Sequence, residues 1–266
     1  MQYSIQLFFL IALTVLTLAC EKIIEPDLAE AEPQLVLEAN LSKRDGLVVN
    51  ITRSVSYFAT DAPTPITDAF VILSSDDGTE LTVPHTGEGR YGLAVDPETA
   101  ITYTLTVVVD GATYTARSTL LPAPELLGLD TEFQPAAGPI DAGNIVYFTY
   151  RDRPGVPDYY RVLHYVDGVP QLTGDDLQIL NDNRNDGLEP RFPVFGHTFE
   201  DGRTITIELI RFDRAVHDYF SGLAEIISEG GPGGGTAAPG NPPSNWSGGA
   251  LGYFGAFSRD ALEVGL

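Results

Sequence analysis

The segment with the composition best suited to metal binding runs from Asn181 to Gly187 and reads NDNRNDG. Calcium loops place oxygen ligands at alternate positions and end with a bidentate glutamate. If Asp182 is the first ligand, Arg184 takes the third position and Pro193 takes the last. Neither residue can supply a carboxylate, so the sequence predicts a polar turn here and no metal site.

Other groups that could do chemistry are scattered along the chain. The sequence has no zinc-binding histidine pair, nucleophile elbow, phosphate loop or dinucleotide fingerprint. Its carboxylates are numerous, but no pair is singled out as an acid and a base. We therefore expect a protein that is not an enzyme and needs no cofactor, with an outer-membrane hydrolase kept as an alternative. The four histidines stand apart, at His85, His164, His197 and His217.

The thiol of Cys20 is the one group whose surroundings indicate a specific reaction. It is the only cysteine, and it follows the apolar run Leu7–Leu18 and the small residue Ala19. This run is shorter than the roughly 18 apolar residues that cross a membrane and suits the core of a signal peptide. The pattern resembles the lipobox of bacterial lipoproteins, in which the thiol receives a diacylglycerol. The sequence predicts a signal peptide over 1–19 and a lipid anchor on Cys20 that palmitate would label; an ordinary cleaved signal with a chance cysteine is the alternative.

The charge balance limits the class of partner. Fifteen basic residues stand against 37 acidic ones, which gives a net charge of −22. Nucleic acid is an unsuitable partner because phosphate binding needs a basic patch. An anionic membrane surface would also repel the chain, so attachment to the outer membrane should depend on the lipid. Such a surface is compatible with a saline habitat, where ions screen the repulsion, and equally with an ordinary acidic protein.

The mature chain begins with an acidic, proline-containing segment over 20–33, which we interpret as a lipidated tether. From 34 to 121 the pattern favours a β-sandwich of the immunoglobulin-like or prealbumin-like kind. The chain also has six Asp-Gly pairs, which suit tight turns between antiparallel strands. The seven strands that we expect lie near 34–41, 47–54, 69–75, 80–84, 90–94, 102–109 and 112–118.

A second antiparallel β domain is predicted over 122–266, after the Leu121–Pro124 step. Its clearest strands are expected at 144–150, 159–166 and 204–212, with a further strand-like end at 250–257. One segment, near 214–228, has apolar residues at helical spacing, and Asp213 can cap its start. The fold class is therefore mainly β with one amphipathic helix, followed by a Gly/Pro-rich loop over 230–243.

Three aromatic residues are candidates for ligand binding. Tyr159 and Tyr160 are adjacent in a predicted strand, and Trp246 is the only tryptophan and follows the Gly/Pro-rich loop. Exposed rings of this kind stack on sugars or peptides, whereas aromatic residues in strands more often fill a core. Both interpretations stay open at this point.

The chain resembles the Bacteroidota surface-lipoprotein family catalogued as domain of unknown function 4249, over nearly all of its mature length. Trp246 departs from the family pattern, in which an aliphatic residue is expected. The resemblance rests on Cys20 with its acidic tether, Thr67–Val71, Gly89–Tyr91, Asp158–Arg161, Asn241–Asn245 and Gly248–Phe254. It implies an outer-membrane lipoprotein often encoded beside TonB-dependent receptors, and it supplies no catalytic residues.

Together these features predict a surface-exposed, non-enzymatic lipoprotein of the outer membrane. It would act as an accessory or binding component of a TonB-dependent nutrient uptake system, with a TonB-dependent receptor as its partner. A cell-surface adhesin or structural module is the alternative.

Overall fold

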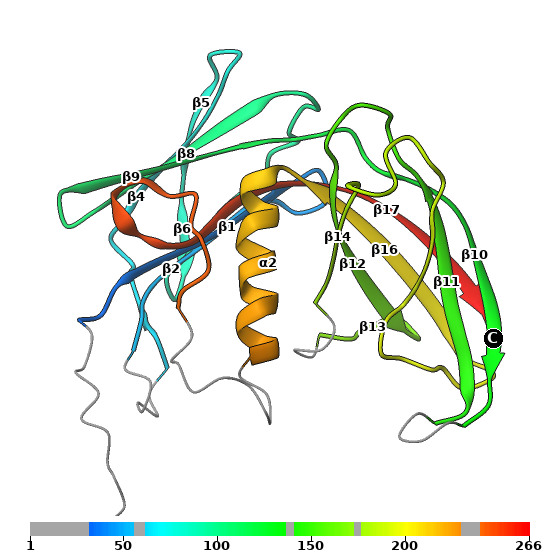
Figure 1. Cartoon of the computed structure of the whole chain (residues 1–266). Coiled ribbons are helices and arrows are strands. Elements are labelled where there is room, and N and C mark those ends of the chain that lie inside the picture. Colours follow the sequence, from blue (N-terminus) through cyan, green and yellow to red (C-terminus); the bar gives the residue numbers. More distant parts are fainter. Residues whose placement is uncertain (1–31, 56–61, 137–140, 173–176, 230–239) are drawn as a thin grey trace, which may run out of the picture. The chain divides into compact units, whose positions relative to one another are not determined.

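The computed structural model describes residues 32–55, 62–136, 141–172, 177–229 and 240–266, and these consist mainly of β-strands with one α-helix (Figure 1). Cys20 and the predicted signal peptide over 1–19 lie outside the described residues. So do most of the tether over 20–33 and most of the loop over 230–243. Within the described ranges, no helix has the length and apolar character that crossing a membrane requires.

In the first half of the chain, the described residues form nine strands. The seven that the sequence predicts are all present, and each of their ends lies within one residue of its expected position. The two additional strands, β3 and β6, are short. The nine are β1 (Leu35–Ser42), β2 (Gly46–Arg53), β3 (Thr64–Pro65), β4 (Phe70–Ser75), β5 (Glu80–Val83), β6 (His85–Gly87), β7 (Arg90–Leu93), β8 (Thr102–Val109) and β9 (Ala112–Thr119).

The second half also consists mainly of strands. A short 3-10 turn, η2 (Ser247–Gly249), precedes its last strand. The other elements are β10 (Glu125–Gln134), β11 (Gly143–Arg151), β12 (Tyr159–Val166), β13 (Val169–Pro170), β14 (Gln178–Asn181), β15 (Arg191–Pro193), β16 (Thr204–Phe212), α2 (Arg214–Glu229) and β17 (Leu251–Gly265).

The strands form three sheets that are antiparallel at every pair but one. A four-stranded sheet has the order β5-β4-β8-β9, and a three-stranded sheet has the order β10-β11-β15. The largest sheet has ten strands, with the main path β13-β12-β16-β17-β1-β2-β7-β6. Its β1–β17 pair is parallel. The predicted mainly β, antiparallel fold is therefore confirmed.

Turn chemistry explains why the hairpins form where they do. Strand β8 alternates buried Tyr103, Leu105, Val107 and Val109 with threonines and Val108. Asp110 and Gly111 then adopt φ of 52° and 78° before β9 begins. Positive φ at both central residues is what a type I′ turn needs, and it suits the twist of the flanking strands. The glycines of all six Asp-Gly pairs have positive φ.

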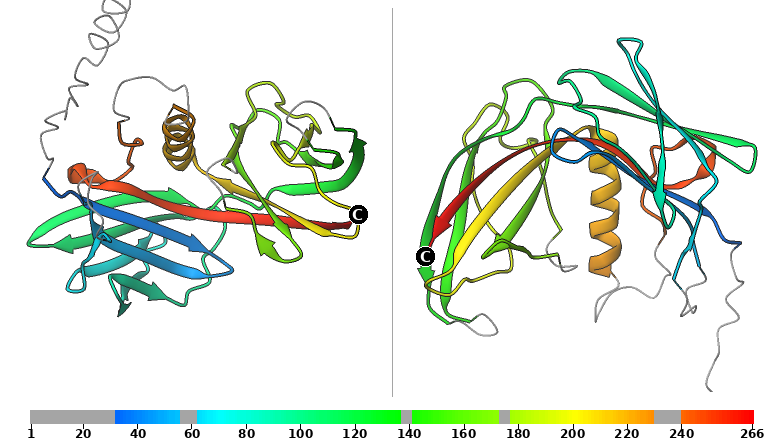
Figure 2. Two further views of the ribbon diagram at one scale, coloured as in Figure 1. Left: turned by 90° about the horizontal axis from the view of Figure 1, so that it is seen from below. Right: turned by 180° about the vertical axis from the view of Figure 1, so that it is seen from behind.

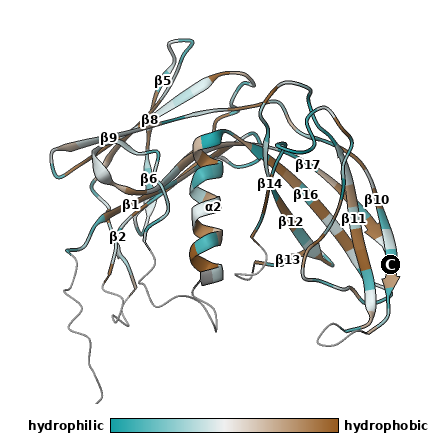
Figure 3. Ribbon diagram, in the orientation of Figure 1, coloured by the Kyte–Doolittle hydropathy of each residue, from teal (hydrophilic) through white to brown (hydrophobic). Residues whose placement is uncertain are grey.

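Helix α2 spans almost the residues that the sequence predicts and lies against the ten-stranded sheet. Its buried residues Val216, Tyr219 and Phe220 form a hydrophobic cluster with residues of β16 and β17. Figure 3 shows apolar and polar residues alternating around this helix. Asp213 Oδ1 accepts a hydrogen bond of 3.2 Å from the backbone nitrogen of Val216, so Asp213 is the cap that the sequence indicates.

Strand β17 connects the two halves. Its first residues pair with β1 from Val36 to Ser42, and its last residues pair with β16. Figure 2 shows this long strand running beside β1 at one end and beside β16 at the other. Phe254 and Ala256 are therefore part of the core of the first half. Pro33–Leu266 form one compact unit, and the division into domains over 34–121 and 122–266 stays a prediction.

Candidate functional site

The three aromatic candidates lie in packed surroundings. Trp246 is 6% exposed, and its indole Nε1 donates a hydrogen bond of 2.9 Å to the carbonyl oxygen of Leu37. Tyr160 is fully buried, whereas Tyr159 is half-buried with its ring 4.6 Å from that of His217. This placement favours the core interpretation of Trp246 and Tyr160, and a ligand-binding role of the three stays a prediction.

The ten-stranded sheet carries a pocket on the face where α2 packs. We call it the arginine pocket; its volume is about 390 Å³. Side chains alternate across a strand, so Tyr160 and Val162 of β12 point to the core, and Arg161, Leu163 and Tyr165 line the pocket. The other residues that line it are Asn40, Arg44, Asp45, Val48, Arg90, Glu208, Ile210, Phe220, Tyr253, Phe257 and Arg259.

The charge of this pocket is opposite to that of the chain as a whole. Four arginines line it against two carboxylates, Asp45 and Glu208, so two positive charges are in excess. Glu208 Oε1 accepts a hydrogen bond of 2.9 Å from Arg44 Nη1 and lies 3.5 Å from Arg259 Nη1. The other carboxylate oxygen of Glu208, Oε2, accepts a hydrogen bond of 2.9 Å from the hydroxyl of Tyr165. Glu208 therefore neutralises part of the Arg44 and Arg259 charge.

Arg161 has no such partner. Its guanidinium lies over the ring of Phe220, 5.1 Å from the centroid, and its buried Nε has no hydrogen-bond partner. None of the carboxylates among the described residues forms an ion pair with it. Burial lowers the pKa of Arg161, and the nearby hydroxyls of Tyr253 and Tyr165 oppose this shift. A half-buried guanidinium without a counter-ion is an unfavourable arrangement.

The arginine pocket has the groups that recognise anions. Guanidinium groups bind carboxylates and phosphates through paired hydrogen bonds, and they do so most strongly where water is excluded. Tyr253 adds an aromatic wall, and its hydroxyl donates a hydrogen bond of 3.0 Å to Asn40 Oδ1. A second cavity, of about 580 Å³, shares Arg44, Glu208, Phe257 and Arg259 with this pocket.

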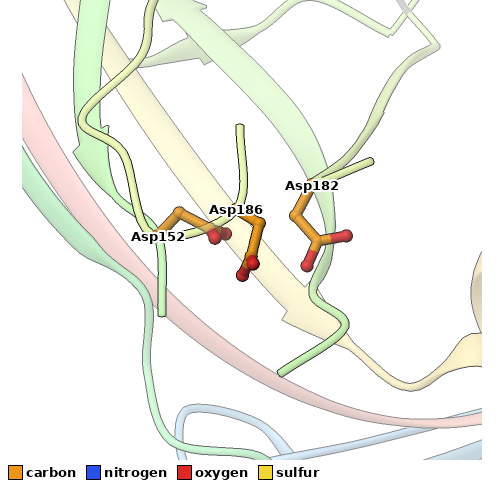
Figure 4. Close-up of side chains that lie close together, drawn as sticks. All are labelled: Asp152, Asp182 and Asp186. Carbon is orange, nitrogen blue, oxygen red and sulfur yellow. The ribbon is translucent and has the colours of Figure 1, made fainter. Parts of the chain in front are cut away.

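A cluster of carboxylates forms a second candidate site beside β11, β12 and β14. It contains Asp152, Asp182 and Asp186 (Figure 4). One carboxylate oxygen from each of the three lies within 4.8 Å of the others. Asp152 Oδ2 accepts a hydrogen bond of 2.9 Å from the nitrogen of Gly187. Asp186 Oδ1 accepts one of 2.6 Å from the nitrogen of Gly155. Backbone donors thus hold these carboxylates in place.

Two tyrosines pack against this cluster from the core. The hydroxyl of Tyr160 donates to Asp158 Oδ2 at 3.2 Å and to Asp152 Oδ1 at 3.3 Å. The ring of Tyr150 lies 4.9 Å from that of Tyr160. Burial raises the pKa of Tyr150, and the charges of Asp152, Asp182 and Asp158 raise it further. Burial also raises the pKa of Asp152.

Comparison with known proteins gives the family of this chain. The model of the family described as a domain of unknown function, DUF4249, matches residues 21–263. The chain belongs to this family. No curated protein matches this DUF4249 chain. A segment of two fibronectin type III domains from chicken tenascin is 17% identical to it, with 68% of this chain and 91% of that chain covered. The TM-score of 0.22 is too low to support an argument from this likeness.

The sequence contains a signal for the arginine pocket of this DUF4249 protein, although sequence reasoning missed it. Arg161 interrupts an aromatic and aliphatic strand, and Arg259 follows Phe257 at a spacing of two. A single arginine in a strand that is otherwise mainly aromatic and aliphatic, as in β12, indicates a polar position on the face opposite the core. The pairing that brings β12, β16, β17 and β1 together could not be read from those strands one by one.

Proposed function

We propose that this DUF4249 protein is a non-enzymatic binding component of nutrient uptake, anchored to the outer membrane by a lipid on Cys20 and exposed at the cell surface. It would capture a ligand that carries a carboxylate or phosphate group and present it to a TonB-dependent receptor. The observation that carries the binding role is the half-buried guanidinium of Arg161, whose buried Nε has no hydrogen-bond partner, in a pocket with excess positive charge.

The anchor is supported by the sequence. The apolar run Leu7–Leu18 ends at Ala19-Cys20. The family match begins at residue 21, directly after this cysteine. The acidic tether over 20–33 would hold the folded part at a distance from the membrane.

The ligand class follows from the cost of burying Arg161. Partial removal of a guanidinium from water without an anionic partner is unfavourable, and the contact with the ring of Phe220 supplies no counter-charge. An incoming carboxylate or phosphate would restore the missing interaction and would gain from the dry surroundings. The surface elsewhere is strongly acidic, so anions would bind at this pocket rather than over the protein as a whole.

Thermal unfolding with a panel of small anions tests this role. Glucuronate, citrate, inorganic phosphate and an acidic tripeptide would each be compared with a neutral counterpart. We expect at least one anion to raise the melting temperature of the full chain, since a ligand that binds only the folded state stabilises it. Arg161→Gln should weaken that binding about tenfold or more.

The same variant separates binding from a structural role. Without ligand, Arg161→Gln should unfold at about the same temperature as the wild type or higher, because it removes a half-buried charge that has no ion-pair partner. Arg214→Gln is the matched control, since the side chain of Arg214 is 79% exposed. Binding of no anion, or equal binding by Arg161→Gln and the wild type, would contradict the proposal.

A further inference from the structure

We propose that Asp152, Asp182 and Asp186 bind a divalent cation, Ca²⁺, that ties together the chain segments following β11 and β14. This inference concerns the second candidate site and uses no residue of the arginine pocket. It also opposes the sequence-based prediction of no metal site.

The first support is the geometry of the oxygens. Each of the three aspartates offers a carboxylate oxygen, and these oxygens all lie within 4.8 Å of one another. Ca²⁺ binds oxygen at about 2.3–2.6 Å, so two ligands of one ion can lie up to about 5 Å apart. The ion tolerates irregular ligand sets and completes them with carbonyl oxygens and water. An all-oxygen set of this kind does not suit Zn²⁺, which prefers nitrogen and sulfur.

The second support is the charge balance. Asp158, the fully buried neighbour of the cluster, pairs with both Arg153 and Arg211. Asp152 and Asp182 are 2% and 7% exposed, and neither these two nor Asp186 forms an ion pair with any of the described residues. Together with Asp158, the three carboxylates of the cluster stand against two arginines, which leaves an excess of two negative charges. A divalent ion supplies the missing charge.

The third support is an unsatisfied donor that is independent of the carboxylates. Tyr150 is fully buried, and its hydroxyl has no hydrogen-bond partner. The ring of Tyr150 lies 4.9 Å from that of Tyr160, whose hydroxyl donates a hydrogen bond of 3.3 Å to Asp152 Oδ1, so Tyr150 lies next to the cluster. Buried hydroxyls nearly always have a partner. A water molecule on the bound ion, or a carboxylate drawn inward by it, would accept this hydrogen bond.

The sequence pattern failed to predict this site because its ligands come from two segments. Asp182 and Asp186 lie in the turn after β14, but the third ligand is Asp152, just after β11. A loop pattern looks for all ligands in one run of residues. The pairing of Tyr159–Val162 with Gln178–Asn181 positions the turn after β14, and the backbone nitrogen of Asp152 donates a hydrogen bond of 3.0 Å to the carbonyl oxygen of Leu188, which brings the two segments together.

Calcium titration of the full chain, stripped with a chelator, tests the site. We expect Ca²⁺ to bind with a stoichiometry of one and to raise the melting temperature. Terbium, a luminescent stand-in for calcium, should be excited through Tyr150 and Tyr160 and displaced by Ca²⁺. Asp186→Asn should weaken Ca²⁺ binding about tenfold or more, because ligand charge sets affinity.

Asp186→Asn is the informative variant because Asp186 is exposed and asparagine can still accept the hydrogen bond from Gly155. Asp68→Asn, at an exposed position away from the cluster in the sequence, is the control and should bind as the wild type does. Tyr150→Phe should bind Ca²⁺ but give weaker terbium emission. The proposal would be overturned if millimolar Ca²⁺ neither bound nor changed the melting temperature, or if Asp186→Asn bound Ca²⁺ as tightly as the wild type.

Discussion

The hydroxyl of Ser118 donates a hydrogen bond of 2.6 Å to Asp213 Oδ2, and this contact joins β9 to the start of α2. The same carboxylate oxygen accepts a hydrogen bond of 3.1 Å from the nitrogen of Thr119. Ser118 Oγ in turn accepts one of 2.9 Å from the nitrogen of Ala256 in β17. One aspartate therefore caps the helix with Oδ1 and ties it to the first half with Oδ2.

Asp213→Ala is expected to lower the free energy of unfolding by about 2 kcal/mol. A helix cap contributes about 1 kcal/mol, and the hydroxyl of Ser118 would lose its acceptor as well. Urea unfolding followed by circular dichroism measures the change. Glu225→Ala on the exposed side of α2 is the control and should have little effect. Equal stability of Asp213→Ala and Glu225→Ala would show that the cap contributes nothing.

Arg211→Ala should be among the most destabilising substitutions in the chain, with a loss of about 3–5 kcal/mol. Arg211 is 2% exposed and pairs with the fully buried Asp158, so its removal leaves a buried carboxylate with less compensation. Arg203→Ala is the matched control: its partner is Asp167, at 2.6 Å, and both side chains are more than 40% exposed. The denaturant midpoint of Arg211→Ala should be clearly lower than that of Arg203→Ala, because exposed ion pairs contribute little. Similar midpoints would refute the expected order of the two variants.

Alkaline pH should weaken the fold through Tyr219. Burial raises the pKa of Tyr219 to about 12 from an ordinary value of 10.0, and the charge of Glu38 adds to the shift. As the pH rises, the unfolded chain loses the hydroxyl proton of Tyr219 before the folded chain does. The contribution of this hydroxyl to the free energy of unfolding is therefore complete below pH 10 and is lost as the pH rises from 10 to 12. The free energy of unfolding, measured with urea from pH 8 to 12, should decline less steeply for Tyr219→Phe than for the wild type. An identical decline in the two proteins would contradict this expectation.

Local features of the fold could be predicted from the sequence because their causes are local. The alternation in β8, the Asp-Gly turns and the apolar stripe of α2 each depend on residues within one element. Strand β17 was predicted only as far as Phe257, because the residues from Ser258 to Gly265 are largely polar and alternate weakly. Those residues become a strand through pairing with β16, which their own composition does not indicate.

Both candidate sites depend on contacts between distant segments, and these could not be read from the sequence. Arg44 Nη1 lies 2.9 Å from Glu208 Oε1, although the two residues are 164 positions apart in the sequence. Asp152 and Asp182 come together because β12 pairs with β14 and because the backbone of Asp152 bonds to that of Leu188. The residue types were visible in advance, but only tertiary pairing determines which of the many carboxylates are buried together.

Cys20→Ala should abolish lipid attachment. The apolar run Leu7–Leu18 is followed by Ala19 and then Cys20, so Cys20 is the predicted acceptor, and the chain has no other thiol. Cells grown with radiolabelled palmitate should label the wild type and leave the variant unlabelled. The variant should also leave the membrane fraction, because an acidic surface gives no attraction to anionic lipids. Equal labelling of the two proteins would exclude Cys20 as the site.

The proposed role in uptake predicts a receptor partner. A tether of about a dozen residues can span roughly 40 Å when extended, so the folded part can reach a neighbouring membrane protein. We expect a TonB-dependent receptor to copurify with the full chain in mild detergent. Protease added to intact cells should remove the folded part, with early cleavage in the loop over 230–243, where glycine and proline are dense.

Two outcomes would decide against parts of this role. Complete protection in intact cells, with cleavage after lysis, would place the protein on the periplasmic side of the membrane. Surface cleavage without any copurifying receptor would favour the alternative of an adhesin or structural module. Cys20→Ala provides the control for both measurements, since a protein released from the membrane should no longer be held beside a receptor. If that variant still copurifies, the contact is made by the folded part itself and not through shared anchoring.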